Sequence, residues 1–238
     1  MAELFDFTIK SGDTEGFEAF GPEHIIWLAV LISAGAAVCA VYKKADKNTR
    51  RCIRRVIAWG ALGIELLRAA LLAAAGEYNI GRLPLHLCAM AVYICALHAW
   101  RGGKLTGQFL YAFCMPGAAF ALIFPDWGYY PALHFMSASS FVIHGLIVTY
   151  VIMQAAAGDI IPDVRKCPQC LGLMLALALP VYVFDMVTGT NYMFLNRPSP
   201  GSPLEWFSFL GRPGFVLGYL PILAAAWAVI YYPFRRRK

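Results

Sequence analysis

The sequence predicts an all-α integral membrane protein, a helical bundle with about seven transmembrane helices in a single domain over residues 1–238. Hydrophobic residues make up 60% of the chain and charged residues only 14%. Soluble domains carry roughly 45–50% apolar and about 25% charged residues, so a soluble fold is disfavoured. The apolar residues also fall into successive runs, each near the length of about 20 residues that crosses a bilayer.

The expected elements follow one another with short connections. Segment 1–20 is acidic and lacks the basic start and cleavage site of a signal peptide, so we expect an acidic external segment there. The third span begins at Pro84, a residue that suits a first helical turn. The expected spans cover residues 24–42, 56–75, 84–100, 105–124, 132–154, 171–188 and 214–232.

The longest connection, residues 189–213, is rich in proline and contains Tyr192 and Phe194. This composition predicts an ordered cap over the bundle rather than a soluble linker. The sequence shows no repeat at a fixed period, which a transporter built from repeated halves would usually have.

The basic residues predict the orientation. The formal net charge is +6, and fifteen basic residues fall in connections 43–55, 101–104 and 155–170 and in the tail 233–238, against four in the segments on the other side. Basic residues collect on the cytoplasmic side, so we expect the N-terminus outside and the C-terminus inside. No aromatic or glycine patterning accompanies the basic runs, so no nucleic-acid partner is expected. We expect a multi-pass protein of the plasma membrane.

Ionisable residues inside spans are costly and are candidates for function. Glu65 and Arg68 are spaced i, i+3 on one helical face, which favours a structural ion pair over a catalytic role. Asp185 lies near the end of the sixth span. It either holds a histidine or a backbone amide of the external cap, or it caps the helix end.

Four of the five histidines (His24, His86, His134 and His144) lie toward the external side or descend from it. Seven cysteines, an odd number placed mostly inside spans, argue against a disulfide framework. The Cys167–Cys170 pair has the C-x-x-C spacing, but no second pair or nearby histidine accompanies it. Free thiols are therefore favoured over a redox or zinc site.

Cys88 and His144 form a candidate nucleophile and base. His86 and Cys88 are about 200° apart around a helix, so a base for Cys88 must come from another helix. His144 is the histidine deepest in a span, and an imidazole beside a thiol generates a thiolate for acyl transfer. The residues alone leave open a buried thiol and a hydrogen-bonded core histidine. Because Cys88 is expected about one turn below the surface and His144 near mid-membrane, the dyad requires a tilted or broken helix.

Several separated motifs resemble a known family. They are Phe20-Gly21-Pro22-Glu23-His24, Leu83-Pro84-Leu85-His86-Leu87-Cys88, His134-Phe135, His144-Gly145, and Asp185 with Thr190–Leu195 and Pro198. Together they resemble the YwaF-type bacterial integral membrane proteins, whose eukaryotic relatives are the transmembrane-protein-164 acyltransferases. The resemblance extends roughly from residue 20 to residue 230.

The resemblance implies transfer of a fatty acyl chain between phospholipids through a cysteine and a histidine, which fall on Cys88 and His144. Membrane phospholipids and lysophospholipids are then the partners, and no cofactor is expected. His86, His24 or His134 would orient the pair or bind the phosphate. Asn191 or Tyr192 would stabilise the oxyanion. Asp185 would set a histidine tautomer.

Three alternatives remain at the level of the sequence. The first is a lipid ester hydrolase that uses the same dyad. The second is a non-enzymatic seven-helix transporter or ligand-binding protein, although no span contains a lysine for a retinal Schiff base. The third is a metal enzyme with His24, His86 and His134 as ligands, although nothing in the sequence makes them converge and no metal is expected.

Overall fold

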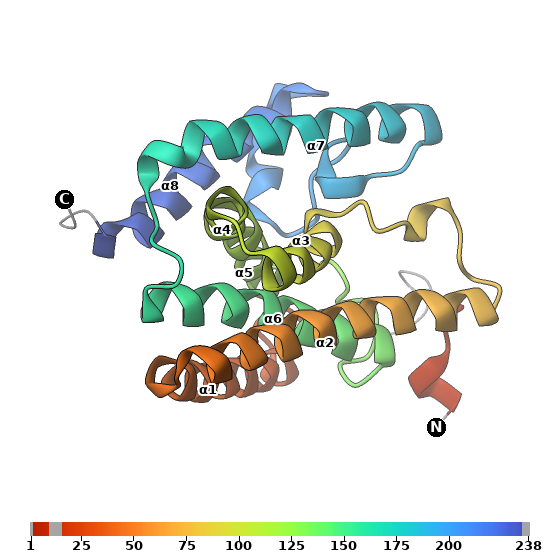
Figure 1. The fold of residues 1–238 in the computed structure, drawn as a ribbon. Coiled ribbons are helices and arrows are strands. Elements are labelled where there is room, and N and C mark those ends of the chain that lie inside the picture. Colours follow the sequence, from red (N-terminus) through yellow and green to blue (C-terminus); the bar gives the residue numbers. More distant parts are fainter. Residues whose placement is uncertain (1, 10–15, 235–238) are drawn as a thin grey trace.

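The computed structural model describes residues 2–9 and 16–234, and these residues form helices and loops without strands (Figure 1). Six helical segments are long and apolar enough to cross a membrane, which confirms the predicted fold class. Four of them are the single helices α1 (Pro22–Lys44), α2 (Lys47–Ala74), α6 (Phe135–Ala157) and α7 (Cys167–Thr188).

The other two long segments are composite. One joins α4 (Lys104–Phe109), the π-helical segment η3 (Leu110–Cys114) and α5 (Met115–Ile123). The other joins η7 (Gly214–Gly218), α8 (Tyr219–Tyr231) and η8 (Tyr232–Phe234). The shorter apolar helix α3 (Leu87–Arg101) lies at the position of the third expected span.

The basic run between the first two helices is helical, and this corrects the expected connection 43–55. Only Ala45 and Asp46 separate α1 from α2. The Asp46 side chain accepts a hydrogen bond from the Thr49 amide at 2.8 Å and caps the N-terminus of α2. The second helix therefore begins nine residues before the expected position 56, because an N-cap residue starts it and long basic side chains can reach past its apolar part to water.

The start of the third helix also differs from the expectation. Leu83 and His86 have extended backbones, and α3 begins at Leu87, so Pro84 precedes the helix instead of occupying its first turn. In Figure 1 the chain leaves α2 at the far right, returns through η2 (Ile80–Arg82), and enters α3 nearer the middle of the molecule. The first residues of α3 therefore lie inside the bundle rather than at its surface.

Helix α6 is the centre of the fold. It contacts α1, α2, α3 and α5. In its most apolar stretch 67% of the residues are buried, against 6% in α1 and 17% in α7. Two glycines allow α1 to pack closely on α6, because a side chain at Gly35 would meet Thr149 and one at Gly145 would meet Leu31, each within 2.8 Å. Small residues permit such close helix contacts in membranes.

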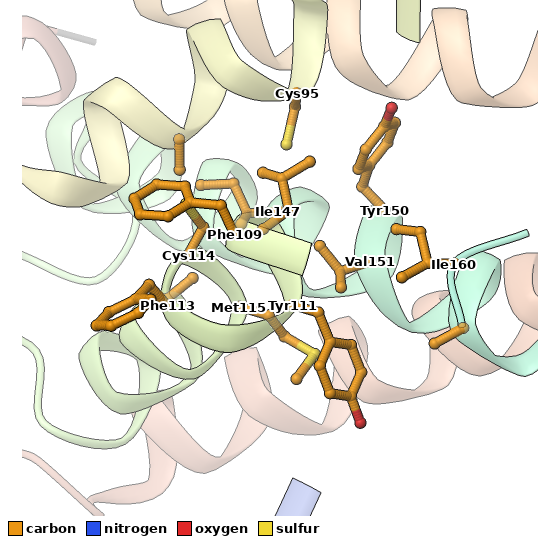
Figure 2. Close-up of a cluster of buried hydrophobic side chains, with 14 of the residues drawn as sticks. Cys95, Phe109, Tyr111, Phe113, Cys114, Met115, Ile147, Tyr150, Val151 and Ile160 are labelled. Carbon is orange, nitrogen blue, oxygen red and sulfur yellow. The ribbon is translucent and has the colours of Figure 1, made fainter. Parts of the chain in front are cut away.

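Most of the buried hydrophobic side chains belong to one cluster, centred between α3, the composite helix 104–123 and α6 (Figure 2). Cys95, Phe109 and Ile147 are among its members. At Pro116 the composite helix lacks the amide that would bond to the Ala112 carbonyl in a regular α-helix. Trp227 Nε1 donates to that carbonyl at 2.7 Å, which links the last long segment to this core.

The two ends of the bundle have different connections. The cap end comprises residues 75–86, 124–134 and 189–213, and it is the end that the sequence places outside. The basic end comprises residues 43–55, 101–104 and 158–166. Five of the basic residues that predict the orientation, Lys10 and the tail residues Arg235–Lys238, lie outside the described residues.

The cap end is well packed. Connection 189–213 contains the short helices η5 (Tyr192–Phe194) and η6 (Pro203–Leu210), as expected for an ordered cap. The N-terminal segment also covers this end, because Phe17 donates from its amide to the Gly128 carbonyl at 2.8 Å. Gly16 is required there, since it has φ +56° and a side chain would collide with the same carbonyl.

Candidate active site

The candidate site begins with the ion pair inside α2. Arg68 Nη2 lies 3.0 Å from one Glu65 carboxylate oxygen and 2.7 Å from the other, as the i, i+3 spacing predicts. Glu65 is buried, whereas the Arg68 side chain keeps 24% of its surface exposed. The pair therefore neutralises a buried carboxylate while its guanidinium remains available to a further anion.

His144 is held in one defined tautomer. Its Nδ1 lies 2.6 Å from the Ser140 carbonyl one turn earlier in α6. A carbonyl can only accept, so Nδ1 carries the proton and Nε2 carries the lone pair. Nε2 has no hydrogen-bond partner among the described residues and is not enclosed by them. The side chain is thus a fixed imidazole that presents a basic nitrogen.

Cys88 lies in the first turn of α3 and is half-buried. The hydrogen bond of 2.8 Å between His98 Nδ1 and the Tyr150 hydroxyl fixes the register of α3 against α6. Counted from this bond, Cys88 lies ten residues toward the cap end and His144 lies six. For parallel helices that is a difference in depth of about 6 Å, or one turn.

The sequence alone implies about 12 Å between the two depths, from their distances to the starts of the expected spans. Helix α3 begins 11 residues before His98, whereas α6 begins 15 residues before Tyr150, so the start of α3 lies about 6 Å deeper than that of α6. This retraction of α3 provides about half of what the tilted or broken helix was expected to provide, and a difference of about one turn remains. No hydrogen bond joins Cys88 to His144 within residues 2–9 and 16–234.

His86 precedes α3 and connects the cap to the site. Its Nδ1 accepts a hydrogen bond from the Met193 amide at 3.3 Å, so its Nε2 carries the proton and is a donor. Met193 and the next residue, Phe194, have φ values of 52° and 53°, a strained conformation for side-chain-bearing residues. His86 therefore offers a donor where His144 offers an acceptor.

Asp185 and Tyr192 hold this cap segment in place. One Asp185 oxygen accepts hydrogen bonds from the Thr190 hydroxyl at 2.6 Å and from the Tyr192 amide at 3.0 Å. The Tyr192 hydroxyl accepts from the Leu83 amide at 2.9 Å and donates to the Ile80 carbonyl at 2.5 Å. Asp185 was expected to hold a histidine or a backbone amide of the cap, or to cap the helix end, and the structure shows the bond to a backbone amide of the cap. The second oxygen of Asp185 is buried and has no partner within the described part of the chain.

Two further residues, Asp126 and Trp127, are not predicted from the sequence and lie in the connection between α5 and α6. The Trp127 ring stacks on His144 with 4.9 Å between ring centroids. Its Nε1 is a buried donor without a partner among the described residues. Asp126 keeps access to solvent, while desolvation by the surrounding protein raises the pKa of its carboxyl and the charges of His86 and Arg68 oppose that rise.

The charged and titratable side chains that influence one another here, together with the Trp127 ring on His144, form a group that we call the site cluster. Its members are Glu65, Arg68, His86, Cys88, Asp126, Trp127 and His144. Arg68 acts on Cys88, His144 and Asp126, so it is the cation that the members share. The connection that supplies Asp126 and Trp127 reads Phe-Pro-Asp-Trp-Gly-Tyr-Tyr. The signal that could have identified Asp126 is an acidic residue within a strongly aromatic connection. Such a connection buries its rings by folding onto the bundle and brings the acidic side chain with it.

The other two histidines of the cap end are structural. His24 accepts from the Phe20 amide and donates to the Leu122 carbonyl, each at 2.8 Å. His134 accepts from the Met136 amide at 3.1 Å and donates to the Asp6 carbonyl at 3.2 Å. With both nitrogens of each ring bonded to backbone, His24 and His134 have no lone pair for a metal. The described residues contain no cluster of three or more histidine, cysteine or acidic side chains arranged for one.

The remaining candidates have partners elsewhere. Asn191 Oδ1 accepts from the Asn196 and Arg197 amides, and its Nδ2 donates to the Arg197 carbonyl. Asn191 and Tyr192 are therefore engaged in hydrogen bonds within the cap. Cys167 and Cys170 are free thiols at the start of α7, as expected.

A comparison with known protein families gives one match. A sequence model of the TMEM164 family matches residues 19–231, which include every element from α1 to α8 and the whole site cluster. No curated protein and no solved structure matches the chain. The match extends over most of the chain, and the helices are those of a multi-pass membrane protein. The chain belongs to the TMEM164 family.

Proposed function

We propose that this protein is an integral membrane acyltransferase that moves a fatty acyl chain from a phospholipid to a second lipid through a thioester on Cys88. The observation that carries the proposal is the tautomer of His144. Its proton is fixed on Nδ1 by Ser140, so Nε2 can act as a base about one helical turn from the depth of Cys88. Such a base is what a thiol nucleophile requires.

The reaction has two balanced steps. In the first, Cys88 Sγ passes its proton to His144 Nε2 and attacks the ester carbonyl of the donor lipid. The thioester forms as the ester C–O bond breaks, and the lysophospholipid leaves with the proton from His144. In the second, the acceptor hydroxyl gives its proton to His144 and attacks the thioester, and the proton returns to Cys88 Sγ.

Two donors near the pair suit the oxyanion of each tetrahedral intermediate. Trp127 Nε1 is buried beside His144 without a partner among the described residues, and His86 Nε2 carries a proton. Unpaired buried donors are costly unless a ligand uses them. Arg68 is the cation that attracts the lipid phosphate, since Glu65 occupies only part of its guanidinium.

We also propose an orientation and a membrane for the protein. The basic end lies in the cytoplasm, the cap end lies outside, and α3 with the six longer segments makes seven spans of the plasma membrane. Phospholipid reaches Cys88 from the outer leaflet, because the site cluster lies beneath the cap end. The retracted start of α3 supports this route, because Cys88 in its first turn then lies beneath the cap residues rather than among them.

The experiment is a transfer assay in nanodiscs with phosphatidylcholine as donor and lysophosphatidylethanolamine as acceptor, followed by lipid mass spectrometry. We expect acylated phosphatidylethanolamine from the wild type and none from Cys88→Ser or His144→Ala. Cys39→Ser is the matched control, because Cys39 is also a half-buried thiol in a span. It should retain wild-type activity.

The products also separate the competing functions. Free fatty acid that depends on Cys88 and His144, without acylated acceptor, would assign a lipid ester hydrolase. Product that persists in Cys88→Ser would contradict the thioester. If neither product forms with any phospholipid class, the dyad has no catalytic role, and a non-enzymatic transporter or binding protein becomes the better account.

A further inference from the structure

A large cavity lies at the basic end, remote from the site cluster. Its volume is about 980 Å³, and it is formed by the first turns of α2, the junction between α3 and α4, the end of α6 and the connection to α7. Its basic lining residues are Arg51, Arg54, Arg55, Arg101, Lys104 and Lys166. Among the residues that the structure describes, two acidic side chains line it, Asp159 and Asp163.

Both acidic residues already have cationic partners. Asp159 forms ion pairs with Arg50 at 3.2 Å and Arg54 at 3.3 Å. Asp163 pairs with Arg165 at 2.9 Å, and the resulting hydrogen bonds lower the pKa of its carboxyl. The acids therefore do not neutralise the rest of the lining.

Five cations remain without a carboxylate partner in residues 2–9 and 16–234, and all five side chains are exposed. They are Arg51, Arg55, Arg101, Lys104 and Lys166. They come from three separate parts of the sequence, and only the fold makes them converge. Like charges repel one another, so their gathering around one cavity is favourable when an anion occupies it.

The cavity has rigid polar walls. Gln108 donates to the Ile161 carbonyl at 2.7 Å and accepts from the Asp163 amide at 3.0 Å, which fixes the connection after α6. Gln154 also lines the cavity although only 1% of it is exposed, and its Nε2 donates to the Tyr150 carbonyl. A loose basic surface would not have such a framework.

The topological role of basic residues does not account for the cavity. A cytoplasmic excess of lysine and arginine needs only positive charge near the span ends. Lys43, Lys44 and Lys47 supply such charge at the same end and do not line the cavity. The guanidinium groups of Arg51, Arg55 and Arg101 add a fork geometry that matches phosphate oxygens.

We propose that this cavity is a binding site for a phosphate-bearing anion, either the headgroup of an anionic lipid or a soluble phosphate compound. The shared chemistry is a phosphate group held by arginine forks and lysine charges. The site does not involve Cys88 or His144, so it stands whether or not the protein is an acyltransferase.

The test measures binding to the detergent-purified full chain with two probes. Inorganic pyrophosphate is titrated by calorimetry. Short-chain phosphatidic acid is compared with phosphatidylcholine of equal chain length by native mass spectrometry. We expect one or both anions to bind, and added salt to weaken the binding. Pyrophosphate binding identifies a soluble source, whereas retention of phosphatidic acid alone identifies a lipid headgroup.

The triple variant Arg51→Gln/Arg55→Gln/Arg101→Gln should weaken binding at least about a hundredfold, since each charged hydrogen bond lost costs about tenfold or more. These side chains are exposed, so the variant should elute as the wild type does in size-exclusion chromatography. Lys43→Gln/Lys44→Gln/Lys47→Gln removes the same charge outside the cavity and should bind within about threefold of the wild type. Failure of both anions to bind, or equal loss in the two triple variants, would overturn the proposal.

Discussion

The histidines near the cap end divide into two kinds. His24 and His134 have both ring nitrogens bonded to backbone groups, and in each ring one of the two bonds reaches a segment far away in the chain. His86 and His144 each have one nitrogen bonded to backbone and one nitrogen without a partner among the described residues. All four come from the same side of the bundle, but only the second pair keeps a nitrogen for chemistry.

The difference shows how the same residue type serves two purposes. A histidine that bonds to both an amide and a carbonyl satisfies two backbone groups that would otherwise lack partners. Its substitution should therefore lower the stability of the fold. In the other kind of histidine, one nitrogen is bonded to the backbone, which fixes the tautomer, and the other nitrogen stays available. Substitution of such a histidine should reduce turnover instead. Substitution of one histidine of each kind separates these two effects.

The largest effect is expected for His144→Ala. Removal of the base should reduce turnover about a thousandfold, equivalent to about 4 kcal/mol of activation free energy. The melting temperature should fall because a buried ring and its stacking on Trp127 are lost, but by less than in His24→Ala, since the hydrogen bond that is lost lies within α6 itself. Transfer kinetics and thermal unfolding in the same detergent measure both quantities. A thousandfold loss that is matched by loss of folded protein would place His144 with the structural histidines.

The second effect concerns stability. His24→Ala removes a fully buried ring and its hydrogen bonds to Phe20 and Leu122, so the free energy of unfolding should fall by about 3 kcal/mol. Turnover per folded molecule should stay near that of the wild type. Chemical unfolding followed by tryptophan fluorescence gives the stability. A loss of turnover at normal stability would contradict the structural role of His24.

Trp127→Phe should reduce turnover about a hundredfold. The substitution keeps an aromatic ring against His144 but removes the unpaired Nε1 donor proposed for the oxyanion. Loss of one such donor typically costs a factor of about 10² to 10³. The reduction should appear in kcat with an unchanged KM for donor lipid. Unchanged kcat would assign the donor another role.

The smallest effect is expected for Tyr192→Phe. Loss of the hydroxyl breaks its bonds to Ile80 and Leu83, and the free energy of unfolding should fall by about 1.5 kcal/mol. Turnover should decrease by less than about tenfold, because the hydroxyl positions the segment before α3 and does not touch the substrate. Turnover as low as that of Trp127→Phe would restore Tyr192 as an oxyanion donor.

Much of the fold follows from the sequence because the membrane imposes length and polarity on each helix. The exceptions are local. Asp46 caps a helix inside a basic run that resembles a connection, so hydropathy alone starts α2 too late. Pro84 suits a first helical turn, but the extended backbone at Leu83 and His86 keeps it outside α3. Both exceptions depend on backbone contacts that a hydropathy pattern does not report.

The site was predictable only in part. The spacing of Glu65 and Arg68 is sufficient for their pairing, because both lie on one helix face. The relation of Cys88 to His144 depends on the retraction of α3, which the sequence does not contain. Trp127 meets His144 because a connection folds onto the bundle, and contacts between separate segments of this kind require the three-dimensional structure.

If Cys88 carries the acyl group, the protein must gain the mass of a fatty acyl chain during turnover, and intact-protein mass spectrometry measures this gain. Purified protein is incubated with a defined phospholipid without acceptor, and the adduct is mapped by proteolysis. The account predicts an added fatty-acyl mass on Cys88 that is absent in His144→Ala, present in Cys39→Ser and discharged when lysophospholipid is added. An adduct on another residue, or transfer of acyl chains without any adduct in wild type, would contradict it.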